Sequence, residues 1–319
     1  MEPYKLYVLT ALTIGPALEL NAQARLFNFG DFDQWIVRNI KESRIIGGNT
    51  KHLYEIGPTA EWNNNNAYTN QGGSPWATSN VMAKVCGITK TNNSVYREER
   101  GDGYCARLET HIEEVKVMGL VNIEVLAAGS VFLGEVPEPI TGTSNPMSKL
   151  SIGVPFTERP KAIQFDYKVK LTDDTCRIRM TGFSKVSKVA GADMPDAICL
   201  LQKRWEDKDG KIHALRIGTM IHRFNQTTDD WVNNANFEIK YGDITNDADY
   251  KDYMGLIIGD DAIYARNSKG KMVTVSEDGW ADADETPTHI VLKFDSSHGG
   301  AYIGSVGTTL WIDNVHVVY

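Results

Sequence analysis

The segment YCARLET at Tyr104–Thr110 has the alternating pattern of a β-strand. Side chains point alternately to the two faces of a strand, so Arg107 and Glu109 lie side by side on one face while Leu108 lies on the other. A sheet face in a soluble domain is usually either packed or exposed to water. If the face of Arg107 and Glu109 is concave, the pair forms a polar floor suited to hydroxyl-rich ligands. If the face is solvated, the two residues form an ordinary surface ion pair.

Strand patterns of the same kind recur along the chain. In Ala162–Leu171 apolar residues alternate with polar ones, and Leu310–Tyr319 is largely apolar on both faces. Further strands, separated by Gly, Pro, Asn and Asp, are predicted at Lys51–Ile56, Met82–Ile88, Arg177–Lys185, Ile198–Trp205, His213–Ile221, Trp231–Tyr241, Tyr253–Ile258, His289–Phe294 and Ala301–Ile303. Short helices are predicted at Trp35–Ser43, with Asp33 as the N-cap, and at Ile112–Val117. The strand spacing predicts an all-β sandwich or barrel.

The N-terminal residues have the three parts of a secretory signal. Met1–Lys5 carries a lysine, Leu6–Leu18 is mostly apolar, and Asn21–Ala24 contains small residues. The apolar run of about 13 residues is shorter than the roughly 20 that cross a bilayer. We therefore predict a signal peptide at residues 1–24 and a single folded domain at residues 25–319. The alternative is a buried N-terminal helix or strand.

Charge and cysteine content limit the class of protein. The formal net charge of −8 and the lack of a basic stripe argue against nucleic acid as a partner. No later segment is apolar enough to span a membrane. The four cysteines are Cys86, Cys105, Cys176 and Cys199. They permit three disulfide pairings, which the sequence leaves open, and a buried thiol is the alternative for Cys105 and Cys199 because both lie in predicted strands.

Two short motifs resemble those of carbohydrate-binding jelly rolls. Gly30–Trp35 has the pattern Gly-x-Phe-(Asp/Glu)-x-Trp, and Leu310–Val315 ends in Asp-Asn-Val. More specifically, the chain resembles the putative carbohydrate metabolism domain (PCMD) family of exported bacterial proteins, and the resemblance concerns the jelly-roll domain only. The resembling stretches are Trp35–Pro58, Pro75–Lys90, Gly103–Thr110, Gly153–Lys168 and Leu310–Tyr319. The resemblance implies a β-sandwich jelly roll of the carbohydrate-binding-module or galactose-binding type, with a pocket placed like the sugar sites of related glycoside hydrolases. It implies a ligand class and not a reaction.

Sugar sites combine aromatic rings with fixed polar groups. Trp62, Tyr68, Trp76 and Trp231 are the candidate rings, although each is also a candidate core residue. Trp62 and Trp76 flank a loop rich in Asn and Gly, residues 63–73, which we expect to form one wall of a pocket. Asn80 is a candidate partner for sugar hydroxyls.

Glycoside hydrolysis requires two carboxyl groups at a defined separation. Glu109 and Asp166 are the candidate pair, because each lies on a strand face away from the aliphatic residues. Arg107 beside Glu109 favours the ionised carboxylate, which suits a nucleophile or a hydrogen-bond acceptor. The alternative is an Arg–carboxylate pair that orders the floor of the ligand-binding pocket.

A structural Ca²⁺ is the one cofactor that we consider. Asp31, Asp33 and Asp313 lie near the two ends of the predicted domain, and such jelly rolls often join their ends through one calcium ion. Calcium requires six to eight oxygen ligands, and the sequence does not identify the remaining ones.

The sequence therefore predicts an exported protein that binds oligo- or polysaccharide through Trp62, Trp76, Asn80, Arg107, Glu109 and Asp166. We expect it in the periplasm or on the surface of a Gram-negative bacterium, with envelope proteins as further partners. Two other classes stay open. One is a glycoside hydrolase that uses Glu109 and Asp166, and the other is a structural or adhesive surface protein without a sugar site.

Overall fold

The computed structural model describes residues 23–70, 73–85, 87–117, 121–142, 145–182, 186–259 and 262–319. Nearly all of the predicted signal peptide, residues 1–22, lies outside these ranges, and so does Cys86. Cys105, Cys176 and Cys199 are free thiols, and Cys105 and Cys199 are buried, as the alternative interpretation proposed. None of the helices among the described residues is long and apolar enough to cross a membrane.

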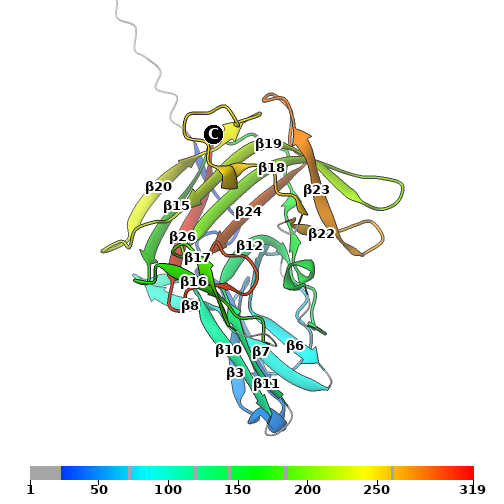
Figure 1. Ribbon diagram of the computed structural model, residues 1–319, viewed down its shortest axis with the longest axis vertical. Coiled ribbons are helices and arrows are strands. Elements are labelled where there is room, and N and C mark those ends of the chain that lie inside the picture. Colours follow the sequence, from blue (N-terminus) through cyan, green and yellow to red (C-terminus); the bar gives the residue numbers. More distant parts are fainter. Residues whose placement is uncertain are drawn as a thin grey trace, which may run out of the picture.

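Two sheets, antiparallel in all pairings but one, form the main body of the protein (Figure 1). The smaller has six strands, and β26 lies at its centre with β15 on one side and β9 and β1 on the other. Its strands are β20 (Val232–Glu238), β15 (Ala162–Lys170), β26 (Thr309–Val318), β9 (Gly103–Glu109), β8 (Val95–Arg100) and β1 (Ala24–Leu26). The predicted strands at Tyr104–Glu109 and Ala162–Leu171 thus become neighbours of the C-terminal strand.

The larger sheet has ten strands, of which the long hairpin β18–β19 and strand β24 form the middle. Its strands are β13 (Ser151–Ile152), β12 (Ser130–Glu135), β24 (His289–Asp295), β18 (Asp196–Glu206), β19 (Ile212–Arg223), β23 (Met272–Trp280), β22 (Tyr264–Arg266), β14 (Val154–Pro155), β21 (Lys240–Tyr241) and β5 (Trp76–Thr78). All of its pairings are antiparallel except β19 with β23.

The hydrophobic core lies between these two sheets. Phe165 and Ile312 of the six-stranded sheet and Leu201 and Phe294 of the ten-stranded sheet belong to one buried cluster. Members of this cluster recur at about every second position of these strands, which places one face of each sheet in the core. The other face of the ten-stranded sheet is also partly apolar, and Leu200 and Val291 there belong to a second buried cluster. The predicted β-sandwich jelly roll is therefore confirmed.

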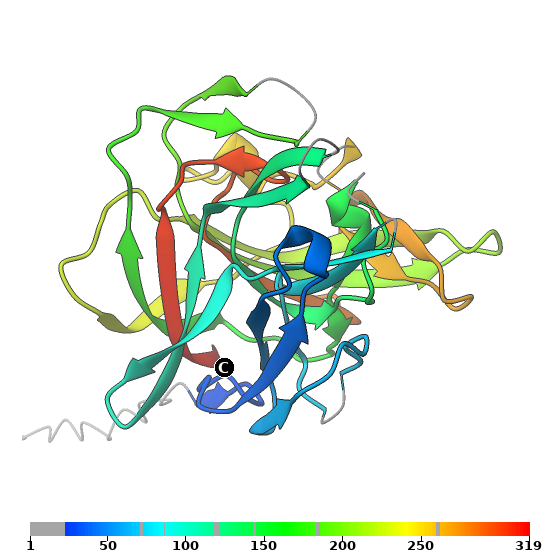
Figure 2. The same cartoon turned by 90° about the horizontal axis from the view of Figure 1, so that it is seen from below.

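Smaller sheets extend the sandwich at one end, where Figure 1 shows strands drawn in blue, cyan and green at the bottom and Figure 2 shows the same end from below. They are β3 (Thr50–Ile56), β2 (Trp35–Lys41) and β4 (Ala60–Trp62); β6 (Val81–Val85) and β7 (Ile88–Asn92); and β10 (His111–Val117) and β11 (Val121–Ala127). A further sheet contains β17 (Ser187–Ala190), β16 (Cys176–Arg179) and β25 (Ile303–Gly304), and three short 3₁₀ helices are η1 (Arg44–Ile46), η2 (Pro146–Lys149) and η3 (Asp252–Met254).

The predicted strand Met82–Ile88 spans parts of two paired strands, β6 and β7, and Ala301–Ile303 is a strand only at Ile303. Three further predicted elements are of the wrong type. The segment Trp35–Ser43 contains strand β2 (Trp35–Lys41) and no helix, and Ile112–Val117 lies in strand β10, which pairs along its whole length with β11. The β-branched residues of both segments favour strands once a partner strand is available. Tyr253–Ile258, predicted as a strand, contains the end of η3 instead.

Candidate functional site

A cavity of about 440 Å³ lies beside strands β3 and β5 and the segment that follows β12. Glu55 of β3, Tyr68 of the Asn-rich loop, Trp76 and Thr78 of β5 and Glu138 are among its lining residues. Ligand pockets usually have volumes of about 300–1,000 Å³ and a lining that combines apolar surface with a few polar groups. This cavity meets both conditions.

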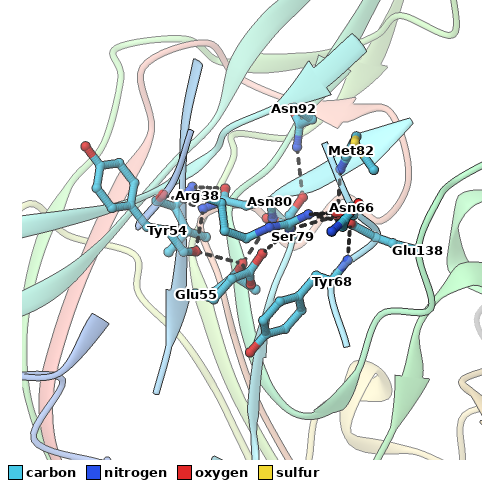
Figure 3. Close-up of polar contacts among 12 residues, drawn as sticks. Arg38, Tyr54, Glu55, Asn66, Tyr68, Ser79, Asn80, Met82, Asn92 and Glu138 are labelled. Carbon is cyan, nitrogen blue, oxygen red and sulfur yellow. Dashed lines mark hydrogen bonds and ion pairs between the residues drawn. The ribbon is translucent and has the colours of Figure 1, made fainter. Parts of the chain in front are cut away.

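A buried arginine joins two glutamates beside the cavity (Figure 3). Arg38 Nη1 lies 2.7 Å from Glu55 Oε1 and 3.0 Å from Glu138 Oε1, and Arg38 Nη2 lies 2.5 Å from Glu138 Oε2. The two glutamate oxygens that share Nη1 therefore cannot be more than about 6 Å apart, since each is within hydrogen-bond distance of the same atom. Arg38 and Glu55 meet because Arg38 pairs with Leu53 and Glu55 with Ile36 in the β2–β3 register, which makes them diagonal neighbours on one face.

Glu138 uses both of its oxygens to hold neighbouring backbone. Oε2 accepts the backbone N–H of Tyr68 at 2.8 Å, and Oε1 accepts that of Met82 at 2.7 Å. With the two contacts to Arg38, its carboxylate has four donors, so Glu138 fixes the position of the loop around Tyr68 relative to strand β6.

Glu55 differs from Glu138 in its surroundings. Its Oε2 accepts a hydrogen bond from Thr78 Oγ1 at 3.1 Å, and its side chain is almost completely buried. Burial raises the pKa of Glu55 to about 7, the charge of Glu138 acts in the same direction, and Arg38 opposes both. Near neutral pH the Glu55 carboxyl group therefore exchanges a proton, and it can either donate or accept a hydrogen bond at the cavity wall.

The replacement Glu55→Gln is expected to change how stability depends on pH. The folded state keeps the proton of Glu55 up to about pH 7, whereas the unfolded state releases it near the ordinary value of 4.5. Since the folded state binds more protons in this window, ionisation of Glu55 lowers the free energy of unfolding as the pH rises through it. Urea denaturation across the window should show a steeper decline for the wild type than for Glu55→Gln. Equal slopes for the wild type and Glu55→Gln would contradict the assignment.

Tyr68 is the aromatic residue best placed at the cavity. Its ring lies 5.1 Å from the guanidinium carbon of Arg38 and 5.7 Å from the ring of Trp62. Burial raises the pKa of Tyr68, so its hydroxyl group keeps its proton at neutral pH. This hydroxyl is buried and has no hydrogen-bond partner within the described part of the chain.

Two of the predicted site residues, Trp76 and Asn80, line the cavity, but their packing and hydrogen bonds are made with other residues of the protein. Trp76 is 1% exposed, its ring packs against Phe32, and its Nε1 donates to Asn28 O at 3.0 Å. Asn80 donates to the carbonyls of two residues and accepts two backbone N–H groups, so its whole amide is used. Its partners are Tyr54 O at 2.9 Å, Val95 O at 2.7 Å, and the N–H groups of Ser94 and Val95 at 2.9 Å each.

The residues Arg107, Glu109 and Asp166 lie on the six-stranded sheet and do not line the cavity. Arg107 forms ion pairs with Glu98 and with Glu109, while Asp166 lies 2.8 Å from Arg100. The two acids are also far from each other. Glu109 pairs with Thr309 and Asp166 with Asp313, which lie four positions apart on β26, the strand between them.

That register separates the Cα atoms of Glu109 and Asp166 by roughly 16 Å. The carboxyl groups of glycoside hydrolases are about 5–9.5 Å apart, so the register does not support hydrolysis by this pair. Trp231, another candidate ring, immediately precedes β20 of this sheet, and the guanidinium carbon of Arg100 lies 3.8 Å from its ring centroid.

The three aspartates of the predicted calcium site are not brought together. Asp33 Oδ1 accepts the backbone N–H of Tyr104 at 2.8 Å, and Asp313 pairs with Arg100 at 2.5 Å. Among the residues that the structure describes, no three or more His, Cys, Asp or Glu side chains form a group suited to a metal ion. Asp31 therefore belongs to no such group either.

The sequence analysis missed Arg38, Glu55 and Glu138. Two of them carried a signal: Arg38 lies between Ile36 and Ile40, and Glu55 lies two residues after Leu53, so both charges fall on an apolar strand face. A charged residue at such a position is buried only with a partner. Glu138 lies in an irregular segment and has no comparable signal.

The solved structures similar to this chain include two that are each described as a putative glycoside hydrolase. The one from Bacteroides thetaiotaomicron is 17% identical with a TM-score of 0.46, and the match covers 89% of this chain and 70% of that one. The one from Bacteroides vulgatus is 13% identical with a TM-score of 0.43, and the match covers 93% and 95%. No curated protein matches the chain.

A family model provides the assignment that these structures do not. The model described as "putative carbohydrate metabolism domain" matches residues 48–255, which is more than half of the chain. The matched range contains Glu55, Tyr68, Thr78 and Glu138 and thus most of the cavity wall. The chain belongs to the putative carbohydrate metabolism domain family.

Proposed function

We propose that the protein binds carbohydrate in the cavity lined by Glu55, Tyr68 and Thr78. The observation that carries the proposal is the hydroxyl of Tyr68, which is buried at a lining residue of the cavity without a hydrogen-bond partner among the described residues. A buried hydroxyl without a partner is costly, and a sugar hydroxyl can supply the missing hydrogen bond. Family membership supports the same class of ligand.

The cavity wall offers the kinds of group that a saccharide requires. Glu55 and Thr78 provide adjacent oxygen atoms, and Tyr68 provides an aromatic ring with a polar end. An exposed ion pair between Arg266 and Glu135, at 2.7 Å, adds charged groups at the rim. Apolar surface with a few fixed polar groups is the usual composition of a small-ligand site.

Binding fits this wall better than hydrolysis does. Glu55 and Glu138 are close enough to serve as a catalytic pair, but Arg38 lies between them and the oxygens of Glu138 already have four donors. A catalytic carboxyl group must be free to reach the glycosidic oxygen, a water or the anomeric carbon. We therefore propose that the protein retains glycan fragments without cleaving them, and that no reducing sugar is released on incubation.

We also propose an exported location, in the periplasm or on the surface of a Gram-negative bacterium. The support is the signal-like pattern of residues 1–24 and the carbohydrate-related family. Glycans and other envelope proteins are the partners available there.

The replacement Tyr68→Phe tests the proposed site, because it removes one oxygen atom and keeps the ring. A glycan array first identifies a ligand, and isothermal titration then measures the dissociation constant. We expect Tyr68→Phe to weaken binding about 5- to 10-fold, the worth of one hydrogen bond between neutral groups, without lowering the unfolding temperature. The control Tyr104→Phe, which alters a tyrosine of β9 outside the cavity lining, should bind as the wild type does. Equal affinity of the wild type and Tyr68→Phe, or no glycan bound at all, would count against the site.

A further inference from the structure

A row of alternating aromatic and basic side chains crosses the six-stranded sheet on the face opposite the core. Tyr96 of β8 pairs with Arg107 of β9, Arg107 with Trp311 of β26, and Trp311 with Lys168 of β15. Residues paired in this way place their side chains on the same face of the sheet. Residues next to them in the chain, such as Leu108, belong to the buried core cluster, so the row itself faces outward.

Trp231 continues this row at the edge strand β20. It immediately precedes Val232, which pairs with Tyr167, and it therefore lies at the level of Lys168 on the neighbouring strand. Arg100 also lies on the outer face, because it follows the residue of the row on β8 by four positions. Its guanidinium carbon lies 3.8 Å from the centroid of the Trp231 ring, which places this ring on the same face.

The three aromatic rings are spaced evenly along the row. Lys168 lies between Trp231 and Trp311, and the next ring, Tyr96, is separated from Trp311 by Arg107. Neighbouring strands are about 4.8 Å apart, so consecutive rings are about 10 Å apart and the row is about 20 Å long. A ligand that touches all three rings is therefore a chain of several sugar units and not a single one.

Basic side chains hold the rings in position and leave them accessible. Lys168 Nζ is 5.4 Å from the centroid of the Trp311 ring, and the guanidinium carbon of Arg107 is 4.2 Å from that of the Tyr96 ring. The indole N–H of Trp311 donates to Glu98 Oε1 at 2.8 Å. All three rings of the row belong to residues that stay partly exposed. Rings that are fixed in advance lose little side-chain freedom when a ligand binds.

The charges beside the rings oppose an anionic ligand. Arg100 and Arg107 contact two carboxyl groups each, namely Asp166 and Asp313 for Arg100 and Glu98 and Glu109 for Arg107. Each arginine is thereby outnumbered by its carboxylates, and the charge of Lys168 does not create a positive excess. An acidic polysaccharide or a nucleic acid would require such an excess.

We infer that this outer face is a second carbohydrate-binding surface, which takes a linear, neutral polysaccharide that lies across the strands. The faces of aromatic rings are electron-rich and attract the C–H groups of pyranose units, which can stack on Trp231, Trp311 and Tyr96. The carboxylates of Glu98 and Glu109, with side chains 45% and 31% exposed, can accept hydrogen bonds from sugar hydroxyl groups. The surface is independent of the cavity, since none of these residues lines it.

Affinity electrophoresis of the protein in native gels that contain a dissolved polymer tests this surface. The neutral probes are mixed-linkage β-glucan, xylan and galactomannan, and the anionic probes are polygalacturonate and single-stranded DNA. We expect at least one neutral polymer to retard the wild type and both anionic polymers to leave its migration unchanged. Isothermal titration with fragments of the retarding polymer should show an affinity that rises from the disaccharide to the hexasaccharide, because longer chains reach more rings.

Variants in the row should lose this retardation. Trp311→Ala and Trp231→Ala should each weaken binding of the polymer about 10-fold, the effect of losing one well-placed aromatic contact. Trp205→Ala is the matched control, because Trp205 is 43% exposed on the other sheet, where its ring stacks on His213. Tyr68→Phe should be retarded as the wild type is, and retardation by polymer without any binding at the cavity would overturn the proposed function alone.

Several results would overturn the second surface. Absence of retardation by every neutral polymer would do so, and the wild type alone decides this. Retardation by an anionic polymer would show a surface of another kind. Unchanged retardation of Trp311→Ala and Trp231→Ala, or an equal loss in Trp205→Ala, would place the polymer elsewhere. Because Trp231 precedes its strand, Trp231→Ala decides this even if Trp311→Ala does not fold. Retardation that disappears in Tyr68→Phe would assign the polymer to the cavity and leave the proposed function intact.

Discussion

Replacing Arg38 by alanine is expected to lower the free energy of unfolding by about 3–5 kcal/mol, the range for breaking a buried ion pair from one side. Arg38, Glu55 and Glu138 are each almost completely buried, and the arginine is the cation that contacts both carboxyl groups. Without it, two carboxyl groups within about 6 Å of each other lose their charge partner in a medium that solvates them poorly. The loss should appear as a lower midpoint in chemical denaturation.

The design of this experiment separates charge from packing. Arg97→Ala is the matched control, because Arg97 is partly exposed and stacks on Tyr104 in the way that Arg38 stacks on Tyr68. Arg97→Ala should lower the free energy of unfolding by less than about 1 kcal/mol, as most surface substitutions do. Adding Glu55→Gln and Glu138→Gln to Arg38→Ala should recover part of the loss, since the uncompensated carboxylates are then absent. An Arg38→Ala protein as stable as the control would contradict the buried network.

Replacing Trp76 by alanine is expected to cost about 3–5 kcal/mol, the range for removing a large aromatic side chain from a core. Its ring makes edge contacts with Phe27 and Phe32 at centroid distances of 5.8 and 5.5 Å and lies 6.4 Å from Phe294. Removal leaves a void in the core and frees the carbonyl of Asn28, which accepts the indole N–H. Glycan binding should therefore be lost in proportion to the unfolded fraction.

The control Trp311→Ala distinguishes this result from a general effect of tryptophan. Trp311 lies on the outer face of β26, where its Nε1 donates to Glu98 at 2.8 Å and Lys168 lies 5.4 Å from its ring. We expect a cost of about 1 kcal/mol or less. If Trp76→Ala folded normally and lost only its affinity for glycans, Trp76 would be a sugar platform and not a core residue.

The strands of the sandwich could be predicted because their pattern is local. Alternation in Tyr104–Glu109 and Ala162–Leu171 identified β9 and β15 to within one or two residues. The same alternation is present in Trp35–Lys41, but the helix predicted for Trp35–Ser43 separates Arg38 from the face that Ile36 and Ile40 share, whereas strand β2 places all three on one face. The helix prediction therefore did not identify Arg38 as a buried charge beside the cavity.

The candidate site was harder to predict than the fold because its partners are distant in sequence. Arg38 contacts Glu138, which lies 100 residues further along the chain in a segment without a strand pattern. The polar residues Asn80 and Arg107 have the chemistry of a sugar site, but their hydrogen bonds and ion pairs are made within the protein. Sequence alone identifies side chains that can bind a ligand; it does not show which of them are already occupied.

A crystal structure of the protein with the saccharide that binds it best would test the central claim most directly. We expect density for a sugar ring in the cavity, with one of its hydroxyl groups within hydrogen-bond distance of Tyr68 Oη and another near Glu55. Occupied density elsewhere on the molecule, with the cavity containing only water, would show that Tyr68 and Glu55 do not form the carbohydrate site.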